Sequence, residues 1–410
     1  MARRSVLTAL DIGSSKVVAV VAEVDVSGAL AVLGVGQASP AGLRRGMIVD
    51  IEEASRAVVR AVTQAQQMSG VEAKTVLASL SGPHVLTAQN RGVVAIANPQ
   101  REIGPEDVVR VLQAAQVINI PPDRRLLHVL PCQYLVDGYD GIVDPSGMAG
   151  NRLEVEATLV LAAASSIQNL GKVIARAGLQ VQEVVLSALA AAEAVLLPAE
   201  KDLGVVLLDI GGGTTDLAVF QRGSLRLAAV LPVGGDYITS DLAIGLRIPL
   251  AAAEQVKKQH GGIRASPVPE GQEVEVPDFG GEHTKKVSRQ LLAAIVEARV
   301  KEILGLVRQK LAEATDFYML PGGVVLTGGT AALAGLAQLA GEILQMPVRI
   351  GRPQGLEGMA DLVQGPEYAT AVGLLLYGAR SLGRAEAAGG EDVLLGGWLS
   401  RLWAWVRDSF

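Results

Sequence analysis

Two patterns of apolar positions alternate along the first part of the chain. Runs of consecutive apolar residues predict strands, whereas apolar residues spaced by three and four predict a helix. On this basis we expect strands at 6–10, 17–24, 30–35 and 75–80, and a helix at 51–68. Strands that precede and follow a helix in this way are typical of an α/β domain. The first part of the chain is therefore expected to form one such domain.

The pattern changes at residue 84 and returns near residue 160. The helix expected here has Pro105 and acidic residues in its first turn, as helix starts prefer. Residues 84–160 are predicted to be a small inserted domain, after which two helices return to the first domain. The expected elements are strands at 93–97, 126–136 and 153–161, helices at 104–117, 165–177 and 187–197, and a Gly, Pro and Asp-rich loop at 137–150.

The second half repeats the alternation of strands and helices. Gly373 falls inside its last predicted helix, where a glycine costs about 1 kcal/mol relative to alanine. We therefore predict a close packing contact at Gly373. The expected elements are strands at 205–208, 225–230 and 324–326, helices at 236–243, 250–260, 288–311, 331–344 and 368–377, and a loop with short strands at 261–281.

Two glycine turns with nearly the same sequence lie half a chain apart. The first reads DIGSSK and the second DIGGGTTD, and each joins two apolar runs. Glycines let successive backbone N–H groups point inward and hold an anion. One such turn alone is compatible with an ordinary hairpin, but two predict similar domains that face each other across one nucleotide. The candidate phosphate-binding residues are Asp11, Gly13, Ser14, Ser15, Lys16, Asp209, Gly211, Gly212, Gly213, Thr214 and Thr215.

Other polar positions are candidates for the rest of this site. Asp11 and Asp209 end the strands before the two turns, where carboxylates can hold a hydrated Mg²⁺ beside a phosphate. Glu254 and Lys257 lie on one helix face, either as a solvated ion pair or as donors and acceptors for a ribose. A further glycine turn at 327–329 would let the backbone approach a flat ring closely.

Composition excludes several classes of protein. The chain has 410 residues, enough for two or more domains, and half of them are apolar. The net charge of −6, with no basic stripe, argues against a nucleic-acid partner. The single cysteine, Cys132, excludes an internal disulfide framework, and it has no neighbouring histidine pair for zinc. The chain contains no uncharged apolar stretch of about 18 residues, so we predict no membrane span.

The C-terminal end has a composition unlike the rest of the chain. All three tryptophans lie in 398–410, after a glycine-rich segment at 381–397 that we interpret as a flexible linker. A helix here would gather its apolar residues into an arc of roughly 160°, with arginines opposite. It either docks on the protein's own core or lies in a membrane interface, and the linker favours the membrane. The predicted membrane contacts are Trp398, Leu399, Leu402, Trp403, Trp405, Val406 and Phe410.

The two phosphate turns resemble those of the actin, sugar-kinase and heat-shock ATPase superfamily. Within it, the stretches SGPHV at 81, LLHVLPCQYLVDG at 126, DPSGMAGNRLEVE at 144, GGDYITSDLA at 234 and VRIGRP at 348 resemble the FtsA family of bacterial actin-like cell-division proteins over nearly the full length. The implied fold is α/β, an actin-like (ribonuclease H-like duplicated) two-domain ATPase fold. It carries the inserted subdomain of that family and a C-terminal amphipathic helix.

The resemblance also implies a division of the chain and further nucleotide contacts. It adds Gly235 to the phosphate site, Gly328 and Gly329 as the adenosine turn, and the ribose contact for Glu254 and Lys257. The implied units are subdomain 1A at 1–83 and 161–196, subdomain 1C at 84–160, subdomain 2A at 197–230 and 308–380, and subdomain 2B at 231–307.

The function implied by the resemblance is that of a polymerising adaptor. It would bind ATP and Mg²⁺, form actin-like filaments, and tether the FtsZ ring to the cytoplasmic face of the cell membrane at the division site, as a peripheral protein. Subdomain 1C would meet later division proteins, and Arg289 and Arg299 are candidate contacts for the acidic FtsZ C-terminal peptide, although a charge run is often only a solvated face.

Two departures from the superfamily pattern refine this expectation. Thr330 stands where many relatives have a third glycine. Relatives also carry a Gln or Glu that positions the attacking water, at a position that falls near Ser187 here, and no carboxylate stands at that position. Because positioning is most of phosphoryl-transfer catalysis, we expect tight ATP binding with slow or negligible hydrolysis. The alternatives are a PilM-like actin homologue of pilus assembly and a small-molecule kinase of the same superfamily.

Overall fold

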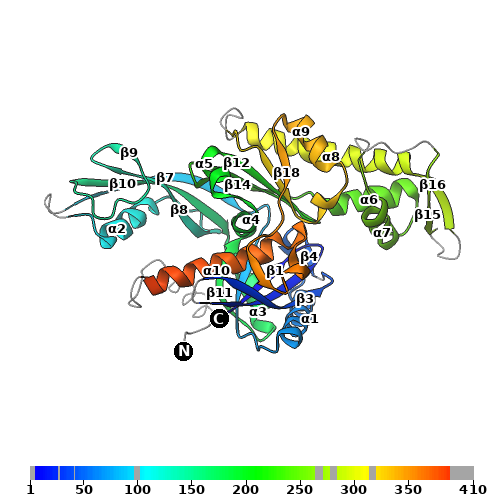
Figure 1. Ribbon diagram of the computed structural model, residues 1–410, viewed down its shortest axis with the longest axis horizontal. Helices are drawn as coiled ribbons and strands as arrows, with labels where there is room; N and C mark the ends of the chain where they lie inside the picture. The colour runs from blue at the N-terminus through cyan, green and yellow to red at the C-terminus, as the bar shows by residue number, and fades with distance from the viewer. Residues whose placement is uncertain are drawn as a thin grey trace.

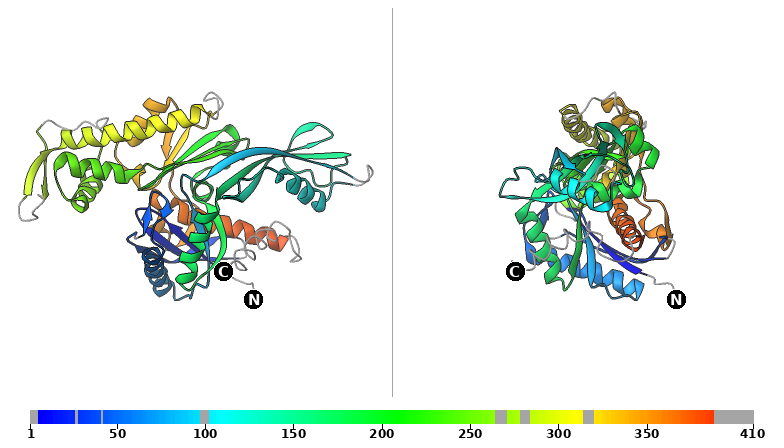
Figure 2. Two further views of the ribbon diagram at one scale, coloured as in Figure 1. Left: turned by 180° about the vertical axis from the view of Figure 1, so that it is seen from behind. Right: turned by 90° about the vertical axis from the view of Figure 1, so that its left-hand side faces the viewer.

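The computed structural model describes residues 5–25, 28–40, 42–96, 102–263, 271–277, 284–313 and 320–387. Two α/β halves lie one above the other in Figure 1, with the N-terminal half below. A smaller sheet projects from one side, and a helical unit that ends in a β-hairpin projects from the opposite side (Figures 1 and 2). Across these described ranges, no helix combines the length and apolar character that a membrane crossing needs.

The lower half is built on a six-stranded sheet in the order β11-β6-β1-β2-β3-β19. Its central strand β2 is almost entirely buried because helices cover both faces of the sheet. β1 and β2 pair antiparallel, whereas β1 and β6 pair parallel. The elements are β1 (Ser5–Ile12), β2 (Val17–Val24), β3 (Leu30–Ala38), α1 (Ile51–Ser69), β6 (Thr75–Leu80), α3 (Ala164–Arg176), β11 (Gln180–Leu186), α4 (Ser187–Val195), β19 (Leu356–Gly358), η3 (Ala360–Val363), η4 (Pro366–Tyr368) and α10 (Ala369–Ala387).

The upper half holds a five-stranded sheet in the order β14-β13-β12-β17-β18. It repeats the local plan of the lower half, since an antiparallel hairpin stands beside a parallel strand. Leu207 and Leu208, at the centre of the sheet, are fully buried on its two faces. The elements are α5 (Pro198–Leu203), β12 (Val205–Ile210), β13 (Thr215–Gln221), β14 (Ser224–Leu231), β17 (Val324–Thr327), η2 (Gly329–Ala332), α9 (Leu336–Leu344) and β18 (Val348–Ile350).

The inserted unit is a four-stranded antiparallel sheet in the order β7-β10-β8-β9 with one helix on it. Its elements are β7 (Leu86–Ala95), α2 (Pro105–Ala115), β8 (Arg124–Val136), β9 (Tyr139–Ile142) and β10 (Arg152–Ala163). The insert also touches the upper half along the edge strand β14. The Thr158 hydroxyl donates to the Leu225 carbonyl oxygen at 2.7 Å, and the Ser224 hydroxyl donates to the Cys132 carbonyl oxygen at 3.2 Å. The first of these bonds satisfies a carbonyl oxygen on the edge strand β14.

The outer unit of the upper half packs three helices on an apolar cluster that continues onto one face of the central sheet. It contains α6 (Gly235–Leu246), α7 (Leu250–His260) and α8 (Arg289–Ala312), together with the hairpin of β15 (Glu273–Pro277) and β16 (Thr284–Ser288). The buried face of α8 follows helical spacing through Val296, Val300 and Val307. The helix runs from the outer hairpin back to the central sheet (Figure 1).

Several elements differ from the sequence predictions. β9 lies inside the predicted loop 137–150, and β11, β18 and β19 were not predicted. β9, β18 and β19 are too short to show a period, with four, three and three residues. A hairpin of β4 (Leu43–Arg44) and β5 (Met47–Ile48) was also missed. The predicted helix 331–344 is instead η2 followed by α9, since Gly335 has a left-handed φ of 83° that interrupts it.

The C-terminal region also differs from its prediction. The helix α10 continues to Ala387, so residues 381–387 of the predicted flexible linker are helical. Any linker would therefore begin after residue 387. The predicted membrane helix at 398–410 lies outside the described residues.

The predicted close contact at Gly373 is confirmed. A Cβ built on Gly373 would lie 1.7 Å from the carbonyl oxygen of Ala190 in α4. Only glycine allows α10 to approach α4 so closely, which explains why a helix interior carries it.

Candidate functional site

The two predicted phosphate turns face each other where the two halves meet. They have the same internal closure, since Gly13 N–H donates to the Lys16 carbonyl oxygen at 3.0 Å and Gly211 N–H donates to the Thr214 carbonyl oxygen at 2.9 Å. A Cβ on Gly212 would lie 2.7 Å from Ser15 Cβ. The glycines of the second turn therefore make room for the serines of the first turn.

Three carboxylates gather behind these turns. Asp11 accepts a hydrogen bond from the Ser79 hydroxyl at 2.7 Å, and Asp216 accepts one from the Ser81 hydroxyl at 2.6 Å. Burial, together with the charges of Asp216 and Asp11, raises the pKa of Asp209 to about 7. Burial likewise raises the pKa of Asp216 to about 6 and raises the pKa of Asp11. The site thus concentrates negative charge that a cation would relieve.

Lys16 is the cation whose charge favours the ionised form of Asp11 and Asp209. Burial lowers the pKa of its ammonium group, while Glu367, Asp11 and Asp209 act in the opposite direction. Its Nζ lies 3.6 Å from the centre of the Tyr368 ring. A lysine held over an aromatic ring is stabilised by the ring electrons and can still reach an anion beside it.

The carboxylates fit a hydrated Mg²⁺ rather than a directly caged metal. No group of three His, Cys, Asp or Glu in the described ranges is close enough to hold a metal ion directly. Mg²⁺ keeps several of its waters and binds through one or two carboxylates and substrate phosphates. Asp11 and Asp209 could hold such an ion through water, and their raised pKa values give it an electrostatic reason to bind.

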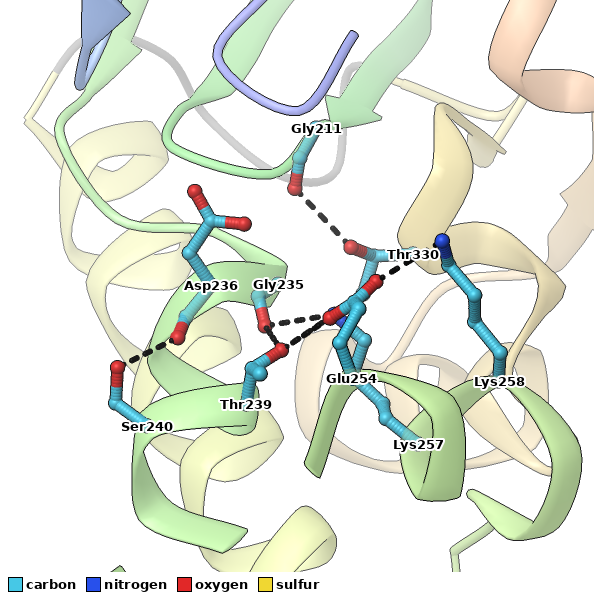
Figure 3. Close-up of polar contacts among 9 residues, drawn as sticks. All are labelled: Gly211, Gly235, Asp236, Thr239, Ser240, Glu254, Lys257, Lys258 and Thr330. Atoms are coloured by element: carbon cyan, nitrogen blue, oxygen red, sulfur yellow. Dashed lines mark hydrogen bonds and ion pairs between the residues drawn. The ribbon is translucent and has the colours of Figure 1, made fainter. Parts of the chain in front are cut away.

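Glu254 and Lys257 form a network at the other end of the site (Figure 3). Lys257 Nζ lies 2.6 Å from Glu254 Oε2 and donates to the Gly235 carbonyl oxygen at 3.0 Å. Burial would raise the pKa of Glu254, but the hydrogen bonds from Lys257 and Thr239 outweigh it and lower that pKa. The predicted ion pair is therefore present. The side chain of Lys257 is only 11% exposed, and the ribose contact stays a prediction.

The third glycine turn completes the site and explains its departure from the superfamily pattern. Gly328 has a φ of 84°, and a Cβ there would lie 2.3 Å from Asp209 Oδ1. Gly329 has only an ordinary contact at 3.7 Å, so its backbone geometry does not demand glycine. The Thr330 hydroxyl donates to the Gly211 carbonyl oxygen at 3.1 Å (Figure 3). Threonine in place of a third glycine thus ties this turn to the second phosphate turn.

Several residues of the site were missed by the sequence predictions. Ser79 and Ser81 lie at the end of β6, and Thr370 donates to Asp209 Oδ2 at 3.1 Å from α10. Ser81 begins the SGPHV stretch that carries the family resemblance, but that resemblance gave it no role, and nothing in the local sequence of Ser79 or Thr370 points to the site. The Gly234-Gly235 pair before Asp236 is a sequence signal that could have pointed to it. Its backbone N–H donates to the Gly212 carbonyl oxygen at 2.8 Å. Burial raises the pKa of Asp236.

The two predicted arginines lie in the outer unit, and Ser187 occupies the position predicted for the water-positioning residue. Ser187 begins α4 and is buried. Arg299 is joined to Asp241 by two hydrogen bonds of 2.6 and 2.9 Å, and Arg289 donates to the Gln272 side chain at 2.8 Å. Both arginines are in α8 of the outer unit, whereas the three carboxylates lie on strands of the two central sheets.

Known families match this chain in two places. The family model described as "Cell division protein FtsA" matches residues 206–373, and that described as "SHS2 domain inserted in FTSA" matches residues 82–161. The chain is 40% identical to the cell division protein FtsA of Pseudomonas aeruginosa over 98% of each chain. It is 36% identical to FtsA of Escherichia coli K12 over 99% of each, and 40% identical to FtsA of Bacillus subtilis over 93% of this chain and 85% of that protein.

Solved structures of lower identity share the fold. A PilM–PilN type IV pilus biogenesis complex matches with a TM-score of 0.65 and 21% identity, covering 91% of this chain and 98% of that one. MreB5 of Spiroplasma citri bound to ADP matches with a TM-score of 0.55 and 16% identity, covering 94% and 98%. The fold is thus actin-like, as predicted, and the near full-length identity decides the family. This chain belongs to the FtsA family of actin-like cell division proteins.

Proposed function

We propose that this protein binds ATP with Mg²⁺ between its two halves, polymerises, and tethers FtsZ to the membrane during cell division. The observation that carries the nucleotide assignment is the contact between the two glycine turns around three carboxylates of raised pKa. The turns supply N–H groups and hydroxyls for phosphates, Lys16 supplies positive charge, and the carboxylates hold hydrated Mg²⁺. When bound, Mg²⁺ neutralises phosphate charge and orients the chain of phosphates.

The nucleotide's role is proposed to be assembly rather than rapid catalysis. Ser187 begins α4 where superfamily enzymes are expected to carry a water-positioning side chain, and serine is too short for that task. We therefore expect ATP to stabilise the protein while phosphate release stays slow. Phosphate release at a turnover comparable to that of actin-like enzymes would contradict this part of the proposal, and phosphorylation of an added small molecule would favour the kinase alternative.

Membrane attachment is proposed to lie in the tryptophan-rich residues 398–410. A helix of that length spans about 20 Å, which suits the membrane surface and not a crossing. One such helix binds weakly, so several on one filament would bind by avidity. The protein would then act on the cytoplasmic face of the cell membrane, with the inserted sheet free to meet later division proteins.

Co-sedimentation with anionic lipid vesicles tests attachment and assembly together. The full chain is compared with a chain that ends at Gly396, each with and without ATP and Mg²⁺. We expect only the full chain to pellet with lipid, and more of it with ATP. Equal pelleting of the two chains would show that 398–410 is not the anchor.

The proposed FtsZ contact is an acidic peptide bound on the outer unit near Arg289 and Arg299. Arg289 is the better test of the two, because Arg299 is already joined to Asp241 and its reversal would disturb that pair. We expect Arg289→Glu to weaken binding of a synthetic FtsZ C-terminal peptide, while Arg308→Glu, an exposed reversal on the same helix, leaves it unchanged. Normal peptide binding by Arg289→Glu would remove Arg289 from the contact.

A further inference from the structure

The β4–β5 hairpin brings a further element to the phosphate turns. At its tip, Gly46 N–H donates to the Ser14 hydroxyl oxygen at 3.0 Å. A Cβ on Gly213 would lie 3.1 Å from Arg45 Cα, and a Cβ on Gly46 would lie 3.0 Å from Thr214 Cγ2. The tip of this lower-half hairpin therefore touches the turns of both halves at once.

The conformation of the tip directs the Arg45 side chain away from the lower half. Arg45 and Gly46 both have positive φ, 51° and 74°, as the two central residues of a tight hairpin turn require. The Arg45 guanidinium lies over the ring of Tyr237 in α6, with 5.3 Å between its Cζ and the ring centre. Tyr237 belongs to the outer unit of the upper half, so this contact joins the two halves.

The ring that Arg45 meets is itself held in place. Arg299 of α8 lies 5.4 Å from the centre of the same ring, and the two hydrogen bonds to Asp241 fix the Arg299 guanidinium. The carboxylate of Asp241 also offsets the repulsion between two arginines on one ring. A guanidinium within about 6 Å of an aromatic ring centre is attracted by it. The ring thus gives Arg45 a rigid partner.

We propose that Arg45 and Tyr237 form a latch between the two halves that slows release of the nucleotide. Arg45 is a positioning residue here, because it acts through Tyr237 and through the hairpin tip that touches both turns. A nucleotide that contacts both turns favours the closed arrangement, and a contact that favours the same arrangement retains the nucleotide longer. This inference rests on the proposed binding of ATP.

The test measures the dissociation rate of a fluorescent ATP analogue from the full-length protein in Mg²⁺. An attraction of about 0.5–1 kcal/mol corresponds to a two- to fivefold change. We expect Arg45→Ala and Tyr237→Leu each to release the analogue about two- to fivefold faster than the unaltered protein, and the double variant to be no faster than either. Arg45→Lys keeps the cation and Tyr237→Phe keeps the ring, so both should stay near the original rate. Arg44→Ala, an exposed change in the same hairpin, is the control.

The outcomes separate the latch from the proposed function. If the unaltered protein does not bind the analogue, ATP binding and the latch both fall. If it binds and Arg45→Ala releases it at the rate of Arg44→Ala, only the latch falls. The latch is also overturned if Arg45→Lys is as fast as Arg45→Ala, or if the effects of the two single variants multiply in the double variant, because the two side chains then act independently.

Discussion

Replacing Asp209 with asparagine should stabilise the protein in the absence of nucleotide while weakening its binding of Mg²⁺ and ATP. Asp209 lies beside two other acids, and its pKa in the folded protein is about 7, against an ordinary value of 3.8. A carboxyl whose pKa is raised by folding binds its proton more tightly in the folded state. Its ionisation therefore lowers stability as the pH rises from about 4 to 7, and the full cost is present above pH 7.

The size of the effect follows from this difference in pKa. Each pKa unit corresponds to 1.36 kcal/mol, so the cost above pH 7 reaches about 4 kcal/mol. Asparagine has no charge to bury and keeps an oxygen for the Thr370 hydroxyl, which donates to Asp209 at 3.1 Å. Because Asp209 is partly exposed, which lowers this cost, we expect the Asp209→Asn protein to gain about 2 kcal/mol at pH 8. The gain should fall to about two fifths at pH 5 and become small near pH 4.

Thermal unfolding in a chelator, without nucleotide, measures this gain at pH 8 and at pH 5. The melting temperature of the Asp209→Asn protein should rise by a few degrees at pH 8 and by less at pH 5. The matched control is Asp140→Asn, which makes the same chemical change at an exposed position in β9 and should leave the melting temperature nearly unchanged. Adding Mg²⁺ and ATP should stabilise the unaltered protein more than the Asp209→Asn protein.

Two results would refute this reasoning. One is a melting temperature of the Asp209→Asn protein at pH 8 that equals or falls below that of the unaltered protein, since Asp209 would then not be a buried charge at that pH. The other is an equal gain at both pH values, which would point to packing rather than ionisation.

Two further predictions concern packing between elements. Gly373→Ala should lower the free energy of unfolding by about 2 kcal/mol or more, because its Cβ would collide with the Ala190 carbonyl oxygen, 1.7 Å away. Gly305→Ala, which has open space around it in α8, should be neutral or stabilising. Urea unfolding compares the two variants, and equal effects would contradict the contact. Thr158→Val should lower the free energy of unfolding by about 1–2 kcal/mol, because the Leu225 carbonyl oxygen loses the 2.7 Å hydrogen bond. The rate of hydrogen exchange in β14 should rise, and an unchanged rate would show that this bond does not hold the insert.

The sequence was enough to predict the two phosphate turns, because their chemistry is local. The glycines and aspartates of DIGGGTTD can be read directly in the chain, and its apolar flanks predict the strands β12 and β13 that hold it. The helix α7 and the strand β6 were predicted with their observed bounds. Repetition of the turn in both halves then predicted two similar domains.

Other predictions failed where a segment depends on a distant neighbour. The strands β18 and β19 have three residues each and exist because β17 and β3 offer them a parallel edge. The tip of the β4–β5 hairpin carries no chemical motif, yet folding places it against both turns. Likewise, Ser79 and Thr370 reach the acids only because β6 ends and α10 begins beside them.

The residues that could bind phosphate were thus predictable from the chain alone, because backbone freedom at glycine and charge at aspartate are properties of single positions. The tertiary structure decided what surrounds them. It set the pKa of Asp209, since burial and two neighbouring acids come from separate strands. It also placed Arg45 of the lower half over Tyr237 of the upper half, because only the packing of the two halves brings those residues together.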